Sequence, residues 1–476
     1  MKKQFLIVFT IIFLLGSFRG QSNLDSILND FLNHEYIENS IVGIELIDGI
    51  SSELLMNYQS NKLLVPASVQ KLYSSSYALK KLGSDYKFKT FVYTNGEIDF
   101  SNQILNGDLI ISLSGDPSLE SRFFDSLSFL DNVCLRLKEL NINTIRGEVI
   151  LIPKTNDYQV NNEWLWGDIG NYYGAGYSTH TFRDNYVDVF FNSSKKLGDS
   201  TFISEFVPFS EKFSIINNVF SSAVKNDLSN ALGAPYQNQR KMTGKIPTNK
   251  NNYKVKISMD DPKEFLRYAI LKSLNENGIA LNKTVGETSN LKDTILIYES
   301  PKLSDLLKVV NFKSNNNYTE HLLMKSAHFV DSSVSLSIAP KIMQKFWEEE
   351  LNIYEDILFS DGSGLSRKNL TSAHSINKLL FYILNEFPLQ LRDIFLSSLP
   401  KAGESGTLKY IGKETILSGK FIGKSGSMGG VRCYSGYFIK SNIHYPFTIM
   451  INNFIRKDFE VRKLIEKLMI AIYKII

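Results

Sequence analysis

The chain is poor in the residue types that build metal sites and disulfide frameworks. Its 476 residues include two cysteines and six histidines, and neither an H-E-x-x-H nor a C-x-x-C pattern occurs. A structural zinc site is therefore not expected. Cys134 and Cys433 either form one bridge or stay as two separate buried thiols, so disulfides cannot be the main framework of a chain of this length.

A strong excess of one charge is also missing. The chain has 53 Lys and Arg against 49 Asp and Glu, and it has no long basic run. Proteins that bind nucleic acids usually concentrate positive charge, so we expect no nucleic-acid partner. With 43% hydrophobic residues, the chain can build a sizeable core, and its length suggests two or three folding units.

No apolar run at the N-terminus reaches the length of a membrane span. Lys2 and Lys3 precede an apolar run over residues 5–15, and small and polar residues follow it. This order is typical of a secretory signal peptide, which we place at residues 1–21. Because a membrane span needs roughly 20 residues, a retained anchor is the less favoured alternative. We expect an exported protein of the periplasm or cell-wall space, with no stable membrane span after processing.

The hydrophobic pattern predicts different secondary structure for the ends and the middle of the chain. Residues 41–48 and 53–59 predict a strand pair, and residues 429–439 and 445–454 predict a hairpin near the C-terminus. A helix over residues 459–476 closes the chain. From about residue 86, strand-like segments alternate with loops rich in Asn and Ser, so the middle block is mostly β.

A serine and a lysine lie one helical turn apart in the segment LLVPASVQKLYSSSYALKKLG, residues 63–83. The pattern predicts a helix with Ser68 and Lys71 just inside its start and on one face. Serine needs a base within hydrogen-bond reach to act as a nucleophile, and a lysine can serve when its pKa is lowered. The pair alone does not identify a nucleophile, because the same spacing occurs at Ser193/Lys196, Ser222/Lys225 and Ser375/Lys378.

Two further motifs make the pair more specific. Ser314-Asn315-Asn316 lies between two predicted helices, and Lys424-Ser425-Gly426 leads into the predicted C-terminal hairpin. The order Ser-x-x-Lys, Ser-x-Asn, Lys-Ser/Thr-Gly is that of penicillin-recognising serine enzymes.

On these motifs the chain resembles the class C low-molecular-mass penicillin-binding proteins, the D-alanyl-D-alanine carboxypeptidase/endopeptidase family. Three further stretches are similar to that family: PASVQKLYSSSYAL at 66–79, NGDLIISLSGDPSL at 106–119 and SDGSGLSR at 360–367. The separation of 246 positions between Ser68 and Ser314 also resembles class C members, in which extra domains follow the nucleophile helix.

The resemblance implies an α+β fold. A penicillin-binding-protein/β-lactamase-like transpeptidase domain, an antiparallel sheet flanked by helices, would be built from residues 22–88 plus 290–476. A large, mostly-β insertion over residues 89–289 would form two small domains.

The resemblance also implies a serine D-Ala-D-Ala carboxypeptidase, with DD-endopeptidase activity as a further option. Ser68 would attack the carbonyl between two terminal D-alanines, Lys71 would take its proton, and Ser314 would relay a proton to the departing amine. The substrates would be peptidoglycan stem peptides, and β-lactam antibiotics would be covalent inhibitors. No metal or organic cofactor is implied.

Substrate-binding roles follow from the same resemblance. Asn316 would orient Lys71 and the substrate amide, while Lys424 and Ser425 would bind the terminal carboxylate. The backbone N–H groups of Ser68 and Ser427 would form the oxyanion hole. Asp168 lies in an aromatic segment where some members contact a basic peptide side chain, and its alternative is a surface carboxylate.

Other functions and motifs remain as alternatives. A β-lactamase-type hydrolase shares the three motifs, but the large insertion argues against it. A non-catalytic cell-wall-binding scaffold would tolerate loss of the motifs, which are intact, and an esterase on the same fold would not need the insertion. The seven-residue spacing of His321 and His328 favours packing over a Ser-His-Asp triad. The 360–367 stretch is interpreted as a glycine-rich turn that shapes the domain.

Overall fold

The computed structural model describes residues 23–124, 128–282 and 293–476. The signal peptide expected at residues 1–21 lies outside the described residues. Within the three described ranges, no helix is long and apolar enough to cross a membrane.

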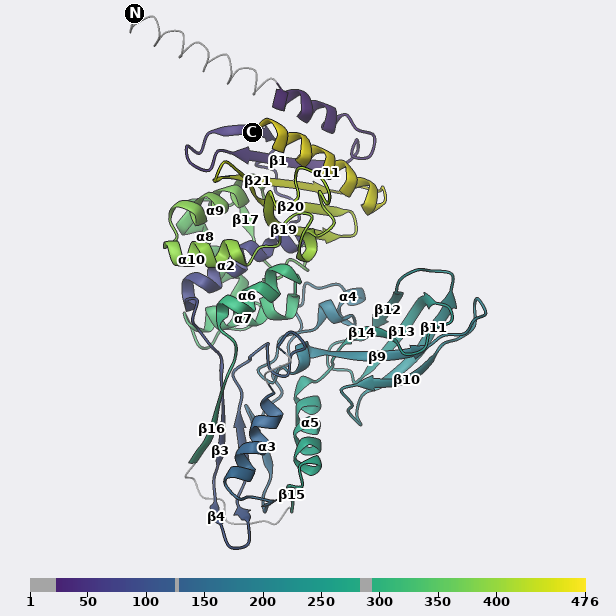
Figure 1. The fold of residues 1–476 in the computed structure, drawn as a ribbon, viewed down its shortest axis with the longest axis vertical. Helices are drawn as coiled ribbons and strands as arrows, with labels where there is room; N and C mark the ends of the chain where they lie inside the picture. Colours follow the sequence, from purple (N-terminus) through teal and green to yellow (C-terminus); the bar gives the residue numbers. More distant parts are fainter. Residues whose placement is uncertain (1–22, 125–127, 283–292) are drawn as a thin grey trace, which may run out of the picture.

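The two ends of the chain build one five-stranded sheet. Its order is β19-β20-β21-β1-β2, and every neighbouring pair is antiparallel. In Figure 1 the first strands, in purple, lie beside the last strands, in yellow-green. The predicted strand pair and C-terminal hairpin are confirmed, whereas β19, which carries Lys424, was expected only as a lead into the hairpin. The strands span Ile41–Ile47 (β1), Leu54–Tyr58 (β2), Phe421–Met428 (β19), Val431–Lys440 (β20) and Ile443–Asn452 (β21).

Helices cover both faces of this sheet, so its strands are apolar on both sides. Tyr434 and Phe438 pack with α11 (Asp458–Ile475) and the helix over residues 23–32. Cys433 and Tyr437 point to the opposite face, because successive side chains of a strand alternate. On that face α9 (Ala373–Asn385) packs directly on the strands. Five further helices belong to the same hydrophobic cluster: α2 (Lys71–Leu82), α6 (Leu303–Phe312), α7 (Asn316–His328), α8 (Ala339–Leu351) and α10 (Leu389–Ser397). The expected antiparallel sheet flanked by helices is confirmed.

The middle of the chain extends away from this sheet as two arms (Figure 1). One arm holds the sheet β16-β3-β6-β8, the small sheet β15-β7-β5-β4, α3 and α5. The other arm holds the sheets β10-β9-β14 and β11-β13-β12. The strands are β3 (Lys89–Thr94), β4 (Glu97–Asp99), β5 (Ile104–Asn106), β6 (Leu109–Ser112), β7 (Thr144–Ile145), β8 (Val149–Ile152), β9 (Tyr186–Asn192), β10 (Phe202–Val207), β11 (Ser214–Ser222), β12 (Leu228–Leu232), β13 (Gln239–Pro247), β14 (Tyr253–Ser258), β15 (Ala280–Leu281) and β16 (Asp293–Glu299), and the helices are α3 (Phe129–Glu139) and α5 (Pro262–Glu276).

Strand pairing bears on where the inserted region ends. Strand β16 pairs antiparallel with β3, so the chain leaves and returns along two neighbouring strands. We propose that the second boundary lies after Glu299 rather than at residue 290, with the first near residue 88. Below, residues 23–88 and 300–476 are called the core part, and residues 89–299 the inserted part.

The two cysteines are separate thiols. Cys134 lies on α3 in the inserted part and Cys433 lies on β20 in the core part, and both are buried and free. The alternative of a single bridge is therefore wrong. Each thiol belongs to a different hydrophobic cluster, which is how buried free cysteines usually behave.

Candidate active site

The structure places Ser68 in a short turn that leads into a helix. A 3-10 turn, η1 (Ala67–Gln70), precedes α2, which begins at Lys71. Lys71 Nζ lies 3.0 Å from Ser68 Oγ, the contact a nucleophile and its base need. The predicted helix therefore starts three residues later than expected, but the turn keeps both side chains on one face. Ala67 has a φ of 46°, a conformation uncommon outside glycine that often marks functional sites.

Lys71 has two further partners. Its Nζ donates to Asn316 Oδ1 at 2.7 Å and to the Ser363 carbonyl at 2.6 Å. The side chain is fully buried. Burial lowers the pKa of Lys71 to about 7, although the charges of Asp361 and Glu320 act in the opposite direction. A lysine with a pKa in this range is neutral in a large fraction of molecules at neutral pH and can accept a proton.

The second lysine, Lys424, lies on β19 and reaches the Ser-x-Asn motif. Its Nζ is 2.8 Å from Ser314 Oγ and 2.9 Å from the Ser425 carbonyl. Burial, together with the charge of Lys71, holds the pKa of Lys424 well below its usual value. The motif loop is fixed from the other side, because the Asn315 side chain caps α7 by accepting from the Tyr318 N–H. Two buried amines therefore share one site.

A cleft of about 690 Å³ opens above these groups. It brings together residues from all three motifs and from the inserted part. Five of the eight sequence-predicted site residues line it: Ser68, Asp168, Ser314, Asn316 and Ser427. Lys71 and Lys424 lie fully buried at its floor, in hydrogen-bond contact with lining serines. Ser425 is not among the lining residues, and it contributes its carbonyl to Lys424.

Strand β19 approaches the nucleophile turn very closely. A Cβ added at Gly426 would lie 2.6 Å from the Pro66 carbonyl oxygen and 3.1 Å from the Ser68 nitrogen. Contacts below 3.0 Å to backbone are not tolerated without movement, so only glycine fits here. The following residue, Ser427, lines the same cleft as Ser68.

The 360–367 loop accepts a hydrogen bond from Lys71 through the Ser363 carbonyl, a contact that the sequence did not predict. The Glu320 carboxylate accepts from the Gly362 and Ser363 N–H groups at 3.2 and 2.8 Å. Gly364 has a φ of 79°, and a Cβ there would lie 1.9 Å from the Ala67 carbonyl oxygen. The loop therefore shapes the domain, as expected, and also presents the Ser363 carbonyl to Lys71.

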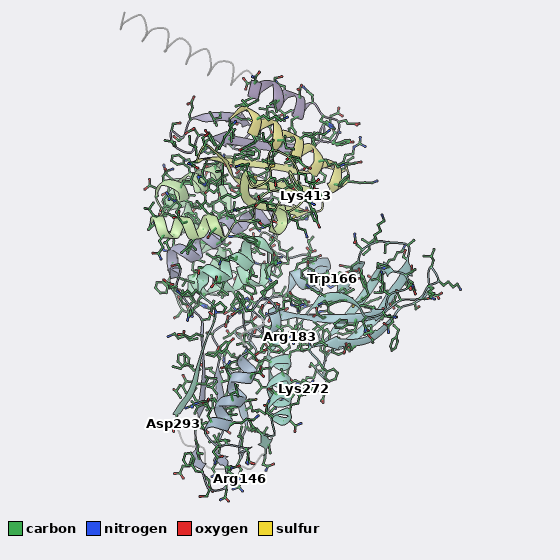
Figure 2. The ribbon with its side chains drawn as sticks, in the orientation of Figure 1. Arg146, Trp166, Arg183, Lys272, Asp293 and Lys413 are labelled. Carbon is green, nitrogen blue, oxygen red and sulfur yellow. The ribbon has the colours of Figure 1, made fainter. Side chains whose placement is uncertain are left out.

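The inserted part holds this loop from outside. Trp164 Nε1 donates to Asp361 Oδ2 at 2.8 Å, and Asn161 Nδ2 donates to the Ser360 carbonyl at 2.6 Å. Asn316 Nδ2 donates to the Tyr173 carbonyl at 2.8 Å, so the Ser-x-Asn motif is also tied to the inserted part. In Figure 2, Trp166 marks α4 (Trp166–Ile169), the helix that carries Asp168, near the core part.

Asp168 faces the cleft rather than open solvent. Tyr173 Oη donates to its carboxylate at 3.1 Å. Burial raises the pKa of Asp168, while the hydrogen bond from Tyr173 and the charge of Arg367 act in the opposite direction. This position suits contact with a substrate group.

The two histidines considered for a triad, His321 and His328, have structural partners. His321 is buried, and its two ring nitrogens contact the Asn317 and Ser178 carbonyl oxygens at 2.8 and 3.0 Å. His328 contacts the Val334 carbonyl at 3.0 Å. Neither lines the cleft, which agrees with packing rather than a triad. Among the described residues, no cluster of three or more His, Cys, Asp or Glu side chains is arranged to hold a metal ion.

Comparisons with known proteins identify the family. The model of the D-Ala-D-Ala carboxypeptidase 3 (S13) family matches residues 21–474. The chain belongs to this family. The expectation of a class C low-molecular-mass penicillin-binding protein and serine-type D-Ala-D-Ala carboxypeptidase is thereby confirmed at the level of the family.

Individual relatives agree along nearly the whole chain. D-alanyl-D-alanine carboxypeptidase DacB of Haemophilus influenzae is 23% identical over 448 residues, covering 90% of this chain and 89% of that protein. The crystal structure of penicillin binding protein 4 (dacB) from Haemophilus influenzae has a TM-score of 0.78 at 21% identity, covering 94% of this chain and 99% of that one. The same protein complexed with a β-lactam has a TM-score of 0.72 at 22% identity, covering 94% and 98%. These structures confirm the penicillin-binding-protein fold.

Proposed function

We propose that this protein is an exported D-Ala-D-Ala carboxypeptidase that cleaves peptidoglycan stem peptides through an acyl-enzyme on Ser68. The observation that carries the proposal is the 3.0 Å contact between Lys71 Nζ and Ser68 Oγ, with the pKa of Lys71 lowered to about 7 by burial. Family membership and the similarity to a protein crystallised with a β-lactam support it. Cleavage of cross-links between two stem peptides is the same chemistry on a longer leaving group.

Acylation would begin at Ser68. Neutral Lys71 takes the hydroxyl proton as Ser68 Oγ forms a bond to the scissile carbonyl carbon. The negative oxygen that results would face the backbone N–H groups of Ser68 and Ser427. The C–N bond to the terminal D-alanine then breaks, and its nitrogen receives a proton that travels from Lys71 through Ser314. Free D-alanine and an ester on Ser68 are the products.

Deacylation would return the enzyme to its starting state. Water adds to the ester carbonyl while Lys71 accepts a water proton, and the Ser68–carbon bond breaks with Ser68 regaining a proton. The shortened peptide leaves as a carboxylic acid. No metal or organic cofactor takes part in these steps.

Only one of the two buried lysines, Lys71 and Lys424, would be protonated at a time. Like charges close together in a buried site disfavour joint protonation. A substrate carboxylate near Lys424 would stabilise the charged form of that lysine and leave Lys71 neutral. The arrangement therefore selects peptides with a free C-terminal carboxylate, with Lys424 and Ser425 as its binding group.

Benzylpenicillin tests the covalent step. A β-lactam resembles the acyl-D-Ala-D-Ala bond, so we expect a one-to-one mass increase on the peptide that contains Ser68. Ser68→Ala should show none, and Lys71→Ala should form the adduct about 10²–10⁴ times more slowly. Ser193→Ala, in a Ser-x-x-Lys pair outside the cleft, is the matched control and should behave as the unmodified protein.

Release of D-alanine separates the alternatives. A long-lived adduct with D-alanine release from a pentapeptide supports the carboxypeptidase, and release from cross-linked dimers adds endopeptidase activity. Rapid turnover of the drug without D-alanine release would mean a β-lactamase-type hydrolase. A folded protein with neither adduct nor release would be a cell-wall-binding scaffold. Export is tested by the N-terminal sequence of the protein recovered from the cell envelope, which should begin near residue 22.

A further inference from the structure

Lys256, on the wall of the cleft, has no partner of opposite charge. It lies on β14 of the inserted part, is half-buried, and lines the same cleft as Ser68. Among the described residues its amine has no hydrogen bond and no ion pair within 4.0 Å, although the charges of Asp188 and Asp184 act on it from further away. Its Nζ lies 5.5 Å from the centre of the Tyr186 ring and 5.8 Å from that of Tyr172. The rings hold the amine in place without neutralising it.

The nearest carboxylates are committed to other cations. Asp184 receives Arg122 Nε at 2.9 Å. Asp188 receives Arg122 Nη1 at 3.0 Å and has Lys254 Nζ at 3.7 Å. Burial, and then the charge of Arg122, lower the pKa of Lys256. A charged hydrogen bond from a bound anion would therefore stabilise the protonated form of this partly desolvated amine.

The cleft as a whole has an excess of positive charge. Its lining includes three cations, Lys256, Lys313 and Arg367, and one carboxylate, Asp168. Arg367 is the cation that acts on Asp168, and it also donates to the Gly429 carbonyl at 2.8 Å. Lys256 and Lys313 are thus left over after the nearest opposite charges are matched, and of these two only Lys256 is half-buried. A ligand that brings a second negative charge would balance it.

A series of contacts relates Lys256 to the catalytic groups. Asn316 binds Lys71 through its oxygen and the Tyr173 carbonyl through its nitrogen. Tyr173 packs edge-on against Tyr172, with ring centres 5.5 Å apart, and the Tyr172 ring contacts Lys256. In the proposed reaction Lys424 takes the terminal carboxylate, so the wall formed by Tyr173, Tyr172 and Lys256 receives the peptide upstream of the scissile bond.

We infer that Lys256 is a specificity-determining residue that binds a carboxylate of the substrate peptide upstream of the scissile bond, on the second residue of the stem. The inference rests on the proposed function, because that function defines which end of the peptide lies at Lys424. It assigns the inserted part a direct role in reading substrate charge.

The test compares binding of two synthetic pentapeptides to the full chain carrying Ser68→Ala, so that no turnover occurs. Both end in D-Ala-D-Ala and have lysine as third residue, and they differ only in whether the second residue carries a free α-carboxylate or a carboxamide. We expect the carboxylate peptide to bind about tenfold more tightly, as for a hydrogen bond between charged groups at a partly exposed site. Lys256→Met should bring the two Kd values together, and Lys256→Arg should keep most of the difference.

Lys254→Met is the matched control, because Lys254 lies two residues away on the same strand but does not line the cleft. It should retain the preference. Equal Kd values for the two peptides before Lys256 is changed, or an unchanged preference in Lys256→Met, would overturn the inference. Lys256→Gln makes the same charge change if the methionine variant does not fold. Failure of the proposed function gives a different result, which is the absence of a penicillin adduct in the protein with Ser68 intact.

Discussion

At the scale of single residues, the pKa of the proposed base, Lys71, is shifted by groups that touch neither Ser68 nor the cleft. Glu320 is fully buried and does not contact Lys71 directly. It holds the Gly362 and Ser363 N–H groups, and the Ser363 carbonyl receives Lys71 Nζ. Burial and the charge of Asp361 raise the pKa of Glu320. Glu320 is therefore a positioning residue whose negative charge also raises the pKa of Lys71.

Glu320→Gln should shift the pH dependence of acylation. Acylation needs neutral Lys71, so its rate rises with pH through the pKa of that lysine, about 7. Glu320 raises this pKa, so its neutral replacement should move the midpoint to lower pH. The measurement is the rate of benzylpenicillin adduct formation from pH 5 to 9. Glu414→Gln, at an exposed surface site, should leave the midpoint in place, and an unmoved midpoint in Glu320→Gln would show that the carboxylate is only structural.

At the scale of elements, the site depends on how closely β19 lies against η1. Gly426 allows this contact, and Gly364 allows the corresponding approach of the 360–367 loop to Ala67. The two glycines therefore approach different atoms of the same turn. The turn that carries Ser68, the proposed nucleophile, is thus in close contact with a strand and a loop that are distant from it in sequence.

Gly426→Ala should weaken catalysis more than it weakens the fold. The added methyl group would push β19 away from the Ser68 N–H and displace the Ser427 N–H, which we propose as an oxyanion donor. Loss of one such donor costs about 10²–10³ in rate. We expect adduct formation to slow by at least about tenfold. Stopped-flow mixing with benzylpenicillin measures this rate, and thermal unfolding of the same protein measures the stability of the fold. Gly167→Ala is the control, since a Cβ there meets nothing within 4 Å. Equal acylation rates for the two variants would contradict the assigned role of the contact.

At the scale of the whole molecule, the inserted part completes a site whose proposed catalytic groups all come from the core part. Trp164 and Asn161 bind the 360–367 loop, and Tyr173 binds Asn316. In Figure 1 the inserted part meets the core part where α4 lies, and α4 carries the cleft residue Asp168. The inserted part supports the loop that orients Lys71 and adds Asp168 and Lys256 to the cleft wall.

Trp164→Phe should therefore slow acylation although it lies outside the catalytic motifs. Phenylalanine keeps an aromatic six-membered ring but removes the five-membered ring whose N–H reaches Asp361. A lost hydrogen bond to a buried carboxylate costs about 1.5–3 kcal/mol, so we expect a lower melting temperature and a several-fold slower benzylpenicillin adduct. Trp166→Phe, which changes a mostly exposed indole on α4, is the matched control. If both variants acylate at the unmodified rate, the inserted part does not support the loop in this way.

The sequence by itself determined the motifs, their order, the family and four of the five strands of the main sheet, all except the edge strand β19. These features depend on local sequence, since one helical turn joins Ser68 to Lys71 and short apolar runs bounded by turn residues mark β1, β2, β20 and β21. Tertiary structure decided the rest. Lys71 meets Asn316 and Ser363 across 245 and 292 positions, and its pKa depends on burial that no local pattern encodes. The roles of Glu320, Gly426, Trp164 and Lys256 likewise arise only when the chain returns from the inserted part, because each acts through a neighbour far away in sequence.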